Sequence, residues 1–279
     1  MIDTVLLNYS VCGAGLPVVL LHGFPLSSEI WSKQRSDLSQ NFMVITPDLR
    51  GHGLSKATGG IYEMDILARD VLALLDYLQI PKAVIIGHSM GGYVALAAWH
   101  QSPDRFLGLG LIASQDGADT EDIALSRHKT AEKVWLEGSE AIVNVMLPKL
   151  FSPGESPNVQ VVESVKKMMA LTPVSGIIGS LSGMASRADF SDELANIKIP
   201  VLILSGELDQ IIPAAKAMAM AVKIRNSTLK IIPKSGHLPM LDNPEATSEC
   251  MNEFLLTIEF RDQMHSGLLA VNDGTASYS

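Results

Sequence analysis

Ser89, Asp209 and His237 are three residues of this 279-residue chain that together could carry out nucleophilic catalysis. A serine hydroxyl is a weak nucleophile at neutral pH, so it needs a base within hydrogen-bond reach. A histidine base in turn needs a carboxylate that fixes its tautomer and stabilises the imidazolium. We therefore interpret Ser89 as the nucleophile, His237 as the base and Asp209 as the acid. The chemistry that this set predicts is acyl transfer through a covalent serine intermediate.

The segment 84–92, Val-Ile-Ile-Gly-His-Ser-Met-Gly-Gly, predicts how the serine is presented. Its first three residues suit a buried parallel strand, and residues 92–99 continue with the apolar spacing of a helix. Between them the pattern Gly-x-Ser-x-Gly predicts a strained turn, in which Gly87 and Gly91 lack the Cβ atoms that would clash. Ser89 would then stand at a helix N-terminus, whose amides favour negative charge. A pentad this short also occurs by chance, so the assignment of Ser89 depends on the presence of Asp209 and His237.

Strand-like apolar runs alternate with helical patterns along most of the chain. The runs are residues 4–10, 16–21, 42–46, 84–86, 106–113, 201–204 and 228–232, and the helical patterns are 28–38, 62–78, 92–99, 214–224 and 244–258. This alternation predicts an α/β fold with a parallel, doubly wound sheet and right-handed crossovers. Ligand sites in such sheets lie outside the carboxyl ends of the strands. Ser89, Asp209 and His237 each follow a strand, so the fold would bring them to one edge.

The alternation stops between residue 115 and about residue 195. Long helical patterns such as 125–137 and 159–171 replace it, and prolines at positions 148, 153, 157 and 173 break them. We interpret this segment as a helical insertion.

Activation of a carbonyl needs two donors aimed at the developing oxyanion. The backbone N–H of Met90, which directly follows the nucleophile, is one candidate by position. The second donor is expected after the strand at 16–21, where Gly23 lets the backbone approach the site. Phe24 carries the first usable amide there, because Pro25 has no N–H.

Composition limits the partners that this protein can have. A hydrophobic fraction of 47% is typical of a folded protein, and the formal net charge of −9 excludes nucleic acid and anionic membranes as partners. No apolar run approaches the roughly 18 residues of a spanning helix, and no basic, apolar leader begins the chain, so we expect a cytoplasmic enzyme. Cys12 and Cys250 are too far apart in sequence for a metal or redox motif.

Five segments give the sequence a family resemblance. His22-Gly23-Phe24, Asp48-Leu49-Arg50-Gly51-His52-Gly53, Gly87-His88-Ser89-Met90-Gly91-Gly92, Gly206-Glu207-Leu208-Asp209 and Gly236-His237 resemble the α/β-hydrolase superfamily over about residues 4–258. Its small carboxylesterase, enol-lactonase and cofactor-free haloperoxidase-like branch is the most similar. Ser89 departs from the epoxide hydrolases and haloalkane dehalogenases, which carry aspartate at that position.

The resemblance implies an eight-stranded, mostly parallel sheet whose second strand is antiparallel, with a helical lid inserted after strand six. The expected division is an α/β-hydrolase core at 1–114 and 196–260, a helical cap or lid at 115–195, and a flexible tail at 261–279. The histidines at 22, 52 and 88 would occupy structural places that support loops around the site.

Two further expectations concern acidic residues outside the three central ones. Asp116 is an alternative acid, because some hydrolases of this superfamily use a carboxylate after the strand that corresponds to 106–113. The glycine-rich loop 47–55 is expected to be held by a network of Asp48 and Arg50.

The resulting hypothesis is a serine hydrolase, a carboxylesterase that cleaves small to medium carboxylic esters without metal or organic cofactor. A lactonase or a cofactor-free perhydrolase would use the same residues. A hydroxynitrile lyase, a C–C hydrolase or a non-catalytic ligand receptor are alternatives of other classes. The expected partner is a small ester or lactone, and the sequence leaves open the acyl and alcohol preference and the oligomeric state.

Overall fold

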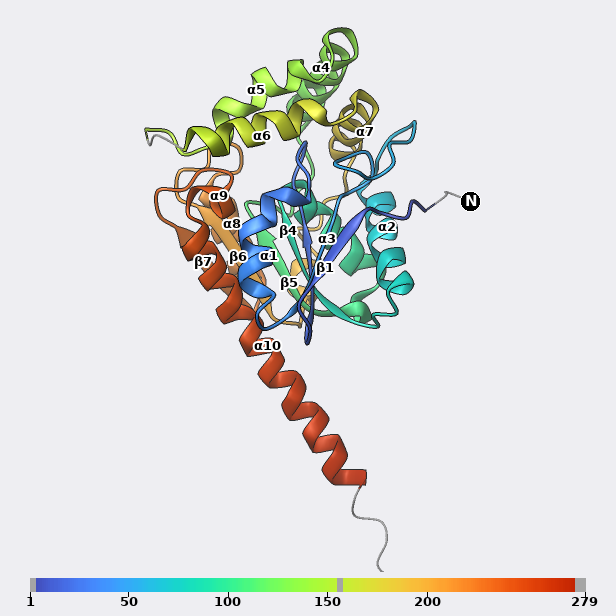
Figure 1. Cartoon of the computed structure of the whole chain (residues 1–279), viewed down its shortest axis with the longest axis vertical. Helices are drawn as coiled ribbons and strands as arrows, with labels where there is room; N and C mark the ends of the chain where they lie inside the picture. Colours follow the sequence, from blue (N-terminus) through green and yellow to red (C-terminus); the bar gives the residue numbers. More distant parts are fainter. Residues whose placement is uncertain (1–3, 155–157, 274–279) are drawn as a thin grey trace, which may run out of the picture.

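The structure is a computed structural model that describes residues 4–154 and 158–273, with the last 13 of these as backbone only (Figure 1). The strands are β1 (Tyr9–Cys12), β2 (Pro17–Leu21), β3 (Met43–Pro47), β4 (Ala83–His88), β5 (Phe106–Ile112), β6 (Val201–Gly206) and β7 (Ser227–Ile232). The α-helices are α1 (Ser32–Leu38), α2 (Met64–Tyr77), α3 (Met90–Gln101), α4 (Glu121–Glu137), α5 (Glu140–Leu150), α6 (Val159–Leu171), α7 (Val174–Ala185), α8 (Ala214–Lys223), α9 (Pro239–Asp242) and α10 (Pro244–Asp273). Short 3-10 turns are η1 (Ser28–Trp31), η2 (Pro103–Arg105) and η3 (Leu194–Asn196).

The strands form one sheet in the order β1-β3-β2-β4-β5-β6-β7, in which every pair except β1 with β3 is parallel. The predicted α/β-hydrolase fold is therefore confirmed, with two corrections. The described residues form seven strands rather than eight, and the antiparallel strand is the first one, not the second. As a result, the helical insertion follows the fifth strand of the described sheet.

The missing strand has a physical cause in the residues that precede β1. A strand at 4–8 would need its backbone amides for a neighbouring strand, but side chains take them instead. The N–H of Val5 donates to Asp70 Oδ1 at 2.8 Å, and the N–H of Asn8 donates to Ser55 Oγ at 2.8 Å. The predicted strand 4–10 is therefore wrong over residues 4–8, and β1 begins at Tyr9 and extends to Cys12.

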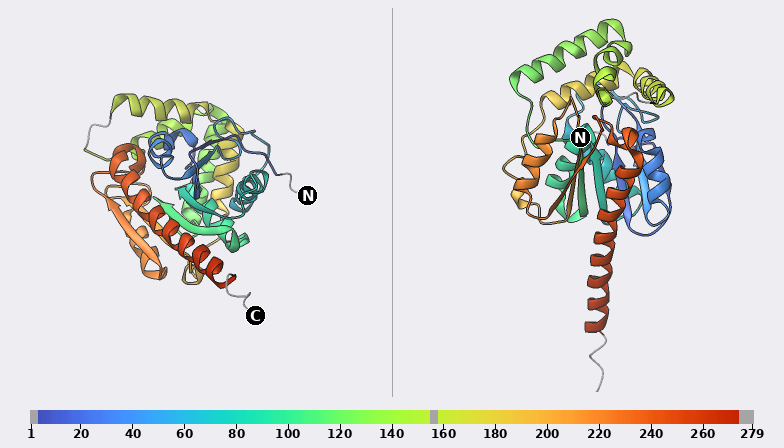
Figure 2. Two further views of the ribbon diagram at one scale, coloured as in Figure 1. Left: turned by 60° about the horizontal axis from the view of Figure 1, so that its bottom comes forward. Right: turned by 90° about the vertical axis from the view of Figure 1, so that its left-hand side faces the viewer.

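Apolar side chains of successive strand residues point to opposite faces of the sheet and build two cores. Val19 and Leu21 of β2 belong to the core that also contains side chains of α2, α3 and α8, whereas Val18 and Leu20 belong to the core that contains side chains of α1 and α10. Figure 2 shows these helices as layers on either side of the sheet. Because both faces are covered, the central strands consist of continuous apolar runs, as the sequence indicated.

Helices α4 to α7, which we call the lid, stand above the carboxyl ends of the strands (Figure 1). Helix α7 lies very close to the loop that precedes α2: a Cβ on Gly183 would lie 1.8 Å from the Tyr62 carbonyl oxygen. The N–H of Tyr62 donates to the Gly179 carbonyl at 2.9 Å. The small residues of α7 therefore fix this side of the lid to the core.

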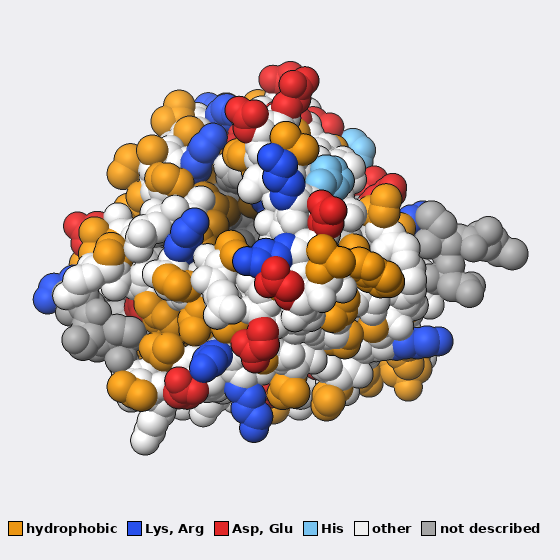
Figure 3. All heavy atoms as spheres, turned by 90° about the horizontal axis from the view of Figure 1, so that it is seen from above, with side chains coloured by type: hydrophobic (Ala, Val, Ile, Leu, Met, Phe, Trp, Pro, Cys, Tyr) orange, Lys and Arg blue, Asp and Glu red, His pale blue; other side chains and the backbone are white. Residues whose placement is uncertain are grey.

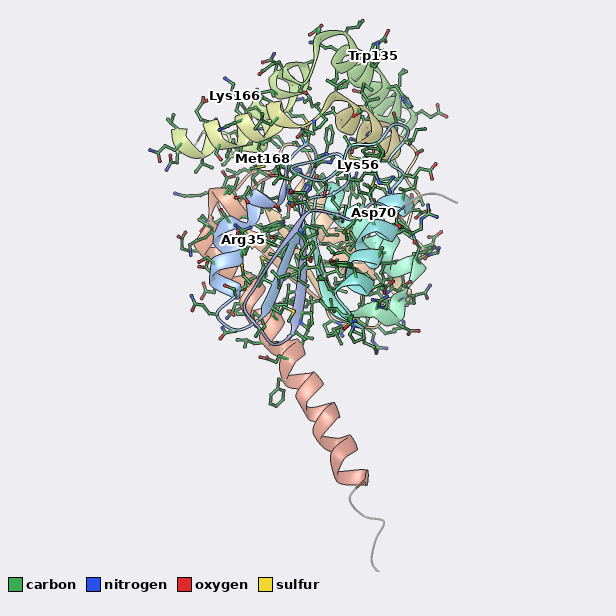
Figure 4. All side chains as sticks on the ribbon, turned by 45° about the vertical axis from the view of Figure 1, so that its right-hand side comes forward. Arg35, Lys56, Asp70, Trp135, Lys166 and Met168 are labelled. Carbon is green, nitrogen blue, oxygen red and sulfur yellow. The ribbon has the colours of Figure 1, made fainter. Side chains whose placement is uncertain are left out.

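The outer and inner surfaces of the lid differ in character. Figure 4 places Trp135 and Lys166 on the outer side and Met168 on the side that faces the core. Trp135 is 73% exposed, and Met168 Sδ accepts a hydrogen bond from the N–H of Ser27 at 3.1 Å. Trp135 therefore faces solvent, whereas Met168 contacts the core.

Three local predictions need correction. Helix α10 continues to Asp273 instead of ending at 258, and Pro148 lies inside α5 instead of ending it. The charges of the loop 48–53 have separate partners: Arg50 forms a buried ion pair with Asp70 at 2.7 Å, and Asp48 accepts from the N–H groups of Ser28 and Leu54. The division into core, lid at 115–195 and flexible tail stays a prediction, and residues 274–279 lie outside the described part of the chain.

A search of the described residues finds no single helix with the length and apolar character to cross a membrane. Helices α6 and α7 meet these criteria only as a pair, and a bend of 91° separates them.

Candidate active site

Ser89, His237 and Asp209 meet at the carboxyl edge of the sheet, beneath the lid. Ser89 follows β4, Asp209 lies in the loop after β6, and His237 lies in the loop after β7. His237 Nδ1 is 2.8 Å from Asp209 Oδ2, and His237 Nε2 is 2.9 Å from Ser89 Oγ. Because an ionised carboxylate only accepts hydrogen bonds, Nδ1 carries the proton and Nε2 is left to accept from the serine hydroxyl.

The turn that holds Ser89 is strained in the way the glycine spacing predicted. Ser89 has φ 51° and ψ −115°, a backbone conformation that non-glycine residues rarely adopt. A Cβ on Gly87 would lie 2.1 Å from the Gly91 carbonyl oxygen, and one on Gly91 would lie 2.6 Å from the Leu21 carbonyl oxygen. Only glycine fits at these two positions, so the turn can bend sharply and leave Ser89 partly exposed among buried neighbours.

The Asp209 carboxylate is oriented by its own loop. Its Oδ1 accepts from the backbone N–H groups of Ile211 at 2.8 Å and Ile212 at 2.9 Å. These two bonds occupy Oδ1 and aim Oδ2 at His237. Asp116, the alternative acid, is elsewhere: its Oδ2 pairs with Lys223 Nζ at 2.9 Å.

The backbone around His237 is held from three directions. Its N–H donates to the carbonyl of Leu150, the last residue of α5, at 2.9 Å, and its carbonyl accepts from His88 Nε2 at 2.8 Å. The N–H of Gly236 donates to Asp242 Oδ2 at 2.6 Å. Burial raises the pKa of Asp242 to about 6, and the nearby Asp209 charge acts in the same direction. The lid and α9 thus both help to position the imidazole.

Phe24 and Met90 have the positions expected of oxyanion donors. Met90 is the first residue of α3, whose first amides have no acceptor within the helix. A Cβ on Gly23 would lie 3.1 Å from Ser89 Cβ, so the Gly23–Phe24 backbone passes beside the serine. Neither the Phe24 nor the Met90 N–H has a hydrogen-bond partner among the residues that the structure describes. Both amides are therefore available to a ligand.

A family model described as the alpha/beta hydrolase family matches residues 18–249 of the chain. The chain belongs to the α/β-hydrolase family. It is similar to 3-oxoadipate enol-lactonase 2 of Acinetobacter baylyi, with 31% identity over 247 residues that span 87% of this chain and 90% of that protein. It is also 30% identical to a non-heme chloroperoxidase of Streptomyces lividans over 259 residues, 86% of this chain and 92% of that one.

A solved structure gives the same assignment for this α/β hydrolase. A thermophilic esterase of Thermogutta terrifontis, described as malate bound, superimposes with a TM-score of 0.89 at 37% identity. The match covers 91% of this chain and 94% of that one. The resemblance to small esterases, enol-lactonases and haloperoxidase-like proteins, drawn from five sequence motifs, is thereby confirmed.

The histidines at 22, 52 and 88 are buried supports of the hydrolase loops. His22 Nε2 accepts from the N–H of Leu49 at 2.8 Å, so its Nδ1 carries the proton and donates to the Gly23 carbonyl at 2.9 Å. This links the loop after β3 to the loop that carries Phe24. Burial lowers the pKa of His22, lowers that of His52 to about 3, and lowers that of His88 well below its ordinary value.

These buried histidines predict acid sensitivity of the fold. In the unfolded chain each binds a proton as the pH falls below about 6.5, whereas in the folded protein each stays neutral. The stability that they contribute is complete above that pH and is lost as the pH falls towards the lowered folded pKa values. For His52, whose pKa in the folded protein is about 3, this amounts to about 1.4 kcal/mol of unfolding free energy per pH unit below 6.5.

Urea unfolding between pH 7.5 and 5 measures this effect. His52→Gln should reduce the loss of stability with acid, whereas the matched variant His128→Gln, at an exposed position of α4, should keep the wild-type slope. The comparison between variants is needed because Asp242, with its raised pKa, changes stability in the opposite direction over the same range. Equal slopes for His52→Gln and the wild type would contradict the prediction.

Sequence reasoning missed the groups that surround the three central residues. The Leu150 carbonyl, which accepts from the N–H of His237, carries no recognisable motif. A cavity next to the site, described below, was also missed, because the sequence does not show how the lid helices face the core. Within the described part of the chain, no three His, Cys, Asp or Glu side chains form a group suited to a metal ion.

Proposed function

We propose that this α/β hydrolase is a carboxylesterase that cleaves small to medium carboxylic esters through an acyl-enzyme. The observation that carries the proposal is the position of His237, whose Nε2 is 2.9 Å from Ser89 Oγ while its Nδ1 is 2.8 Å from Asp209 Oδ2. This is the geometry in which an imidazole can remove a proton from serine and return it to a leaving group. The unpartnered amides of Phe24 and Met90 support the same chemistry.

In the acylation step, Ser89 Oγ attacks the ester carbonyl carbon as its proton passes to His237 Nε2. The carbonyl oxygen becomes an oxyanion and accepts hydrogen bonds from the N–H groups of Phe24 and Met90. The N-terminus of α3 adds a favourable electrostatic contribution at this point. Asp209 stabilises the imidazolium that forms, and it does so without being protonated.

Departure of the alcohol completes the acylation, and water then releases the acyl group with the help of the same residues. The tetrahedral intermediate collapses, and His237 Nε2 gives its proton to the departing alcohol oxygen. A water molecule then donates a proton to His237 and attacks the acyl carbon, and a second collapse releases the carboxylic acid and restores Ser89. Every proton is returned, so no cofactor is consumed.

Lactone hydrolysis is a second candidate, which the name of the Acinetobacter relative and a solved enol-lactonase structure from Burkholderia xenovorans favour. The chemical steps are the same, except that the alcohol stays attached to the acid product. The haloperoxidase-like relatives favour a related variant, in which peroxide instead of water removes the acyl group. Product identity separates these three activities.

Labelling with a fluorophosphonate is the experiment that tests the proposal. An activated serine reacts with this probe, so we expect stoichiometric labelling that peptide mapping assigns to Ser89. Acid release from ethyl butyrate and from a γ-lactone, measured in parallel, then ranks the ester and lactone activities. Absence of labelling at Ser89 in folded protein would refute the proposed function and favour a non-catalytic receptor.

A further inference from the structure

A cavity of about 360 Å³ lies between the lid and the core, and residues adjoining the candidate site line part of it. It shares Phe24 with the oxyanion side of the site and Ile211 and Ile212 with the loop that orients Asp209. Tyr93 of α3, one turn after Ser89, also lines it. A substrate whose ester group sits at Ser89 can therefore place another part of itself in this cavity.

Two lid helices supply the upper wall of the cavity, each through one face. The lining residues of α4 are Ile123, Ser126, Arg127 and Thr130, and those of α5 are Ile142, Val145, Met146 and Lys149. In both helices the spacing is i, i+3, i+4 and i+7, which is a continuous helix face. The wall is thus apolar over much of its area and carries one cation from each helix.

Lys149 is the freer of these two cations. It is exposed and has no ion-pair partner in the part of the chain that the structure describes. It immediately precedes Leu150, whose carbonyl accepts the hydrogen bond from the N–H of His237. Lys149 therefore lies at the C-terminal end of the α5 face that lines the cavity, one residue before the carbonyl that holds the His237 backbone.

Asp119 is the one acid among the residues that line the cavity, and it is already neutralised. Its fully buried carboxylate pairs with Arg127 and with Arg187, whose guanidinium lies 4.3 Å from the centre of the Tyr93 ring. Together Asp119, Arg127 and Arg187 carry one net positive charge, and Lys149 adds a second. Figure 3 shows a hollow on the lid side of the molecule, with basic side chains near it among hydrophobic and acidic ones.

This local charge is opposite in sign to that of the whole protein, whose formal net charge is −9. A partly enclosed, cationic cavity concentrates anions near it and offers charge-assisted hydrogen bonds to a carboxylate. A neutral ester would gain nothing from Lys149.

We propose that the preferred substrates are esters that carry a free carboxylate, such as half-esters of dicarboxylic acids, and that Lys149 and Arg127 bind this carboxylate. The proposal deepens the proposed esterase function and rests on it. Lys149 is then a specificity-determining residue, because it acts on binding of the anionic part of the substrate and leaves the chemical steps to Ser89 and His237.

Two matched substrate pairs test the proposal. One pair places the carboxylate in the acyl part, monoethyl glutarate against ethyl pentanoate, and the other places it in the alcohol part, 4-carboxyphenyl acetate against 4-methylphenyl acetate. For at least one pair, Lys149→Met should reduce the kcat/KM ratio of charged to neutral ester by about tenfold. Lys149→Glu should reduce it further, because it repels the carboxylate.

Lys129→Met is the matched control, since Lys129 is an exposed lysine of α4 that does not line the cavity. It should leave both ratios at the wild-type value. Arg127→Gln should also lower the ratio, but Arg127 pairs with the buried Asp119, so Lys149 is the deciding position. Ratios that stay the same in Lys149→Met and Lys149→Glu for both pairs would overturn the inference.

A binding measurement separates failure of this inference from failure of the esterase proposal. Glutarate should bind to Ser89→Ala protein in a calorimeter, and Lys149→Met in that background should weaken the binding about tenfold. One possible result is that hydrolysis of the neutral esters depends on Ser89, while the affinity for glutarate is the same with and without Lys149. This result would refute only the carboxylate preference. Glutarate binding that depends on Lys149, without Ser89-dependent hydrolysis, would refute only the esterase function.

Discussion

Ser89→Ala is expected to lower kcat for ester hydrolysis by about 10⁵-fold or more, to the residual rate that binding and the oxyanion amides alone supply. The loss is large because the substitution removes the atom that forms the acyl-enzyme. Water would have to attack the carbonyl directly, with His237 as its only activating group.

The alanine protein should fold as the wild type does. The Ser89 hydroxyl has one side-chain partner, His237, whereas the backbone of residue 89 makes the bonds that hold the turn. Its N–H donates to the Ile112 carbonyl at 2.9 Å, and its carbonyl accepts from Ser114 Oγ at 3.0 Å. Alanine keeps all of these and adopts the left-handed backbone conformation at a cost similar to that of serine.

The measurement is the rate of p-nitrophenyl butyrate hydrolysis and of fluorophosphonate labelling, with Tm as the control for folding. Ser205→Ala is a matched variant at a buried serine near the end of β6. It should stay within about twofold of the wild-type rate, because the Ser205 hydroxyl donates to the adjacent Gly206 carbonyl and to no other group among the described residues. Retained turnover in Ser89→Ala protein would show that another residue is the nucleophile.

The arrangement of the site could be predicted from sequence because it depends on strand order and loop position. Ser89, Asp209 and His237 each follow a parallel strand, and parallel strands present their carboxyl ends at one edge. Once the alternation of strands and helices is recognised, these three loops must meet. The supporting role of the histidines at 22, 52 and 88, by contrast, was an expectation from the family resemblance.

Other features depend on contacts between segments that are distant in sequence. The strand expected at 4–8 is absent because Asp70 and Ser55, from a helix and a loop far along the chain, take its amides. Asp70 also forms the ion pair with Arg50 that was expected for Asp48. The pattern of strand and helix propensities contains no information about these distant side chains.

The lid illustrates the same limit for function. Helices α4 and α6 could be predicted from apolar spacing, but α5 and α7 were not delimited, nor was the face of α4 or α5 that meets the core. Arg127 and Lys149 are ordinary surface cations in the sequence, and only the packing of the lid places both on one cavity. Substrate preference is therefore the part of the function that sequence reasoning had to leave open.

Asp209→Asn is expected to lower kcat by about 10⁴-fold, although asparagine has nearly the same shape. The reason lies in the Oδ1 position, which accepts from the N–H groups of Ile211 and Ile212. Only the amide oxygen of asparagine can accept there, so its NH₂ group must face His237. That group donates to Nδ1 and moves the ring proton to Nε2, where the imidazole can no longer accept the proton of Ser89.

Asp116→Asn is the decisive comparison, because Asp116 is the other carboxylate that this family makes a candidate acid. Its partner Lys223 is on the surface, so the loss of that ion pair should change kcat by no more than about twofold. The rate of fluorophosphonate labelling should fall with kcat in Asp209→Asn, whereas glutarate binding and Tm should change little, which a general loss of structure would not produce. A large loss in Asp116→Asn with near-normal activity in Asp209→Asn would move the acid to the loop after β5 and require His237 to turn away from the bond seen here. Since the two neighbouring amides fix Asp209 Oδ2 toward the imidazole, the geometry favours Asp209 as the acid on which turnover depends.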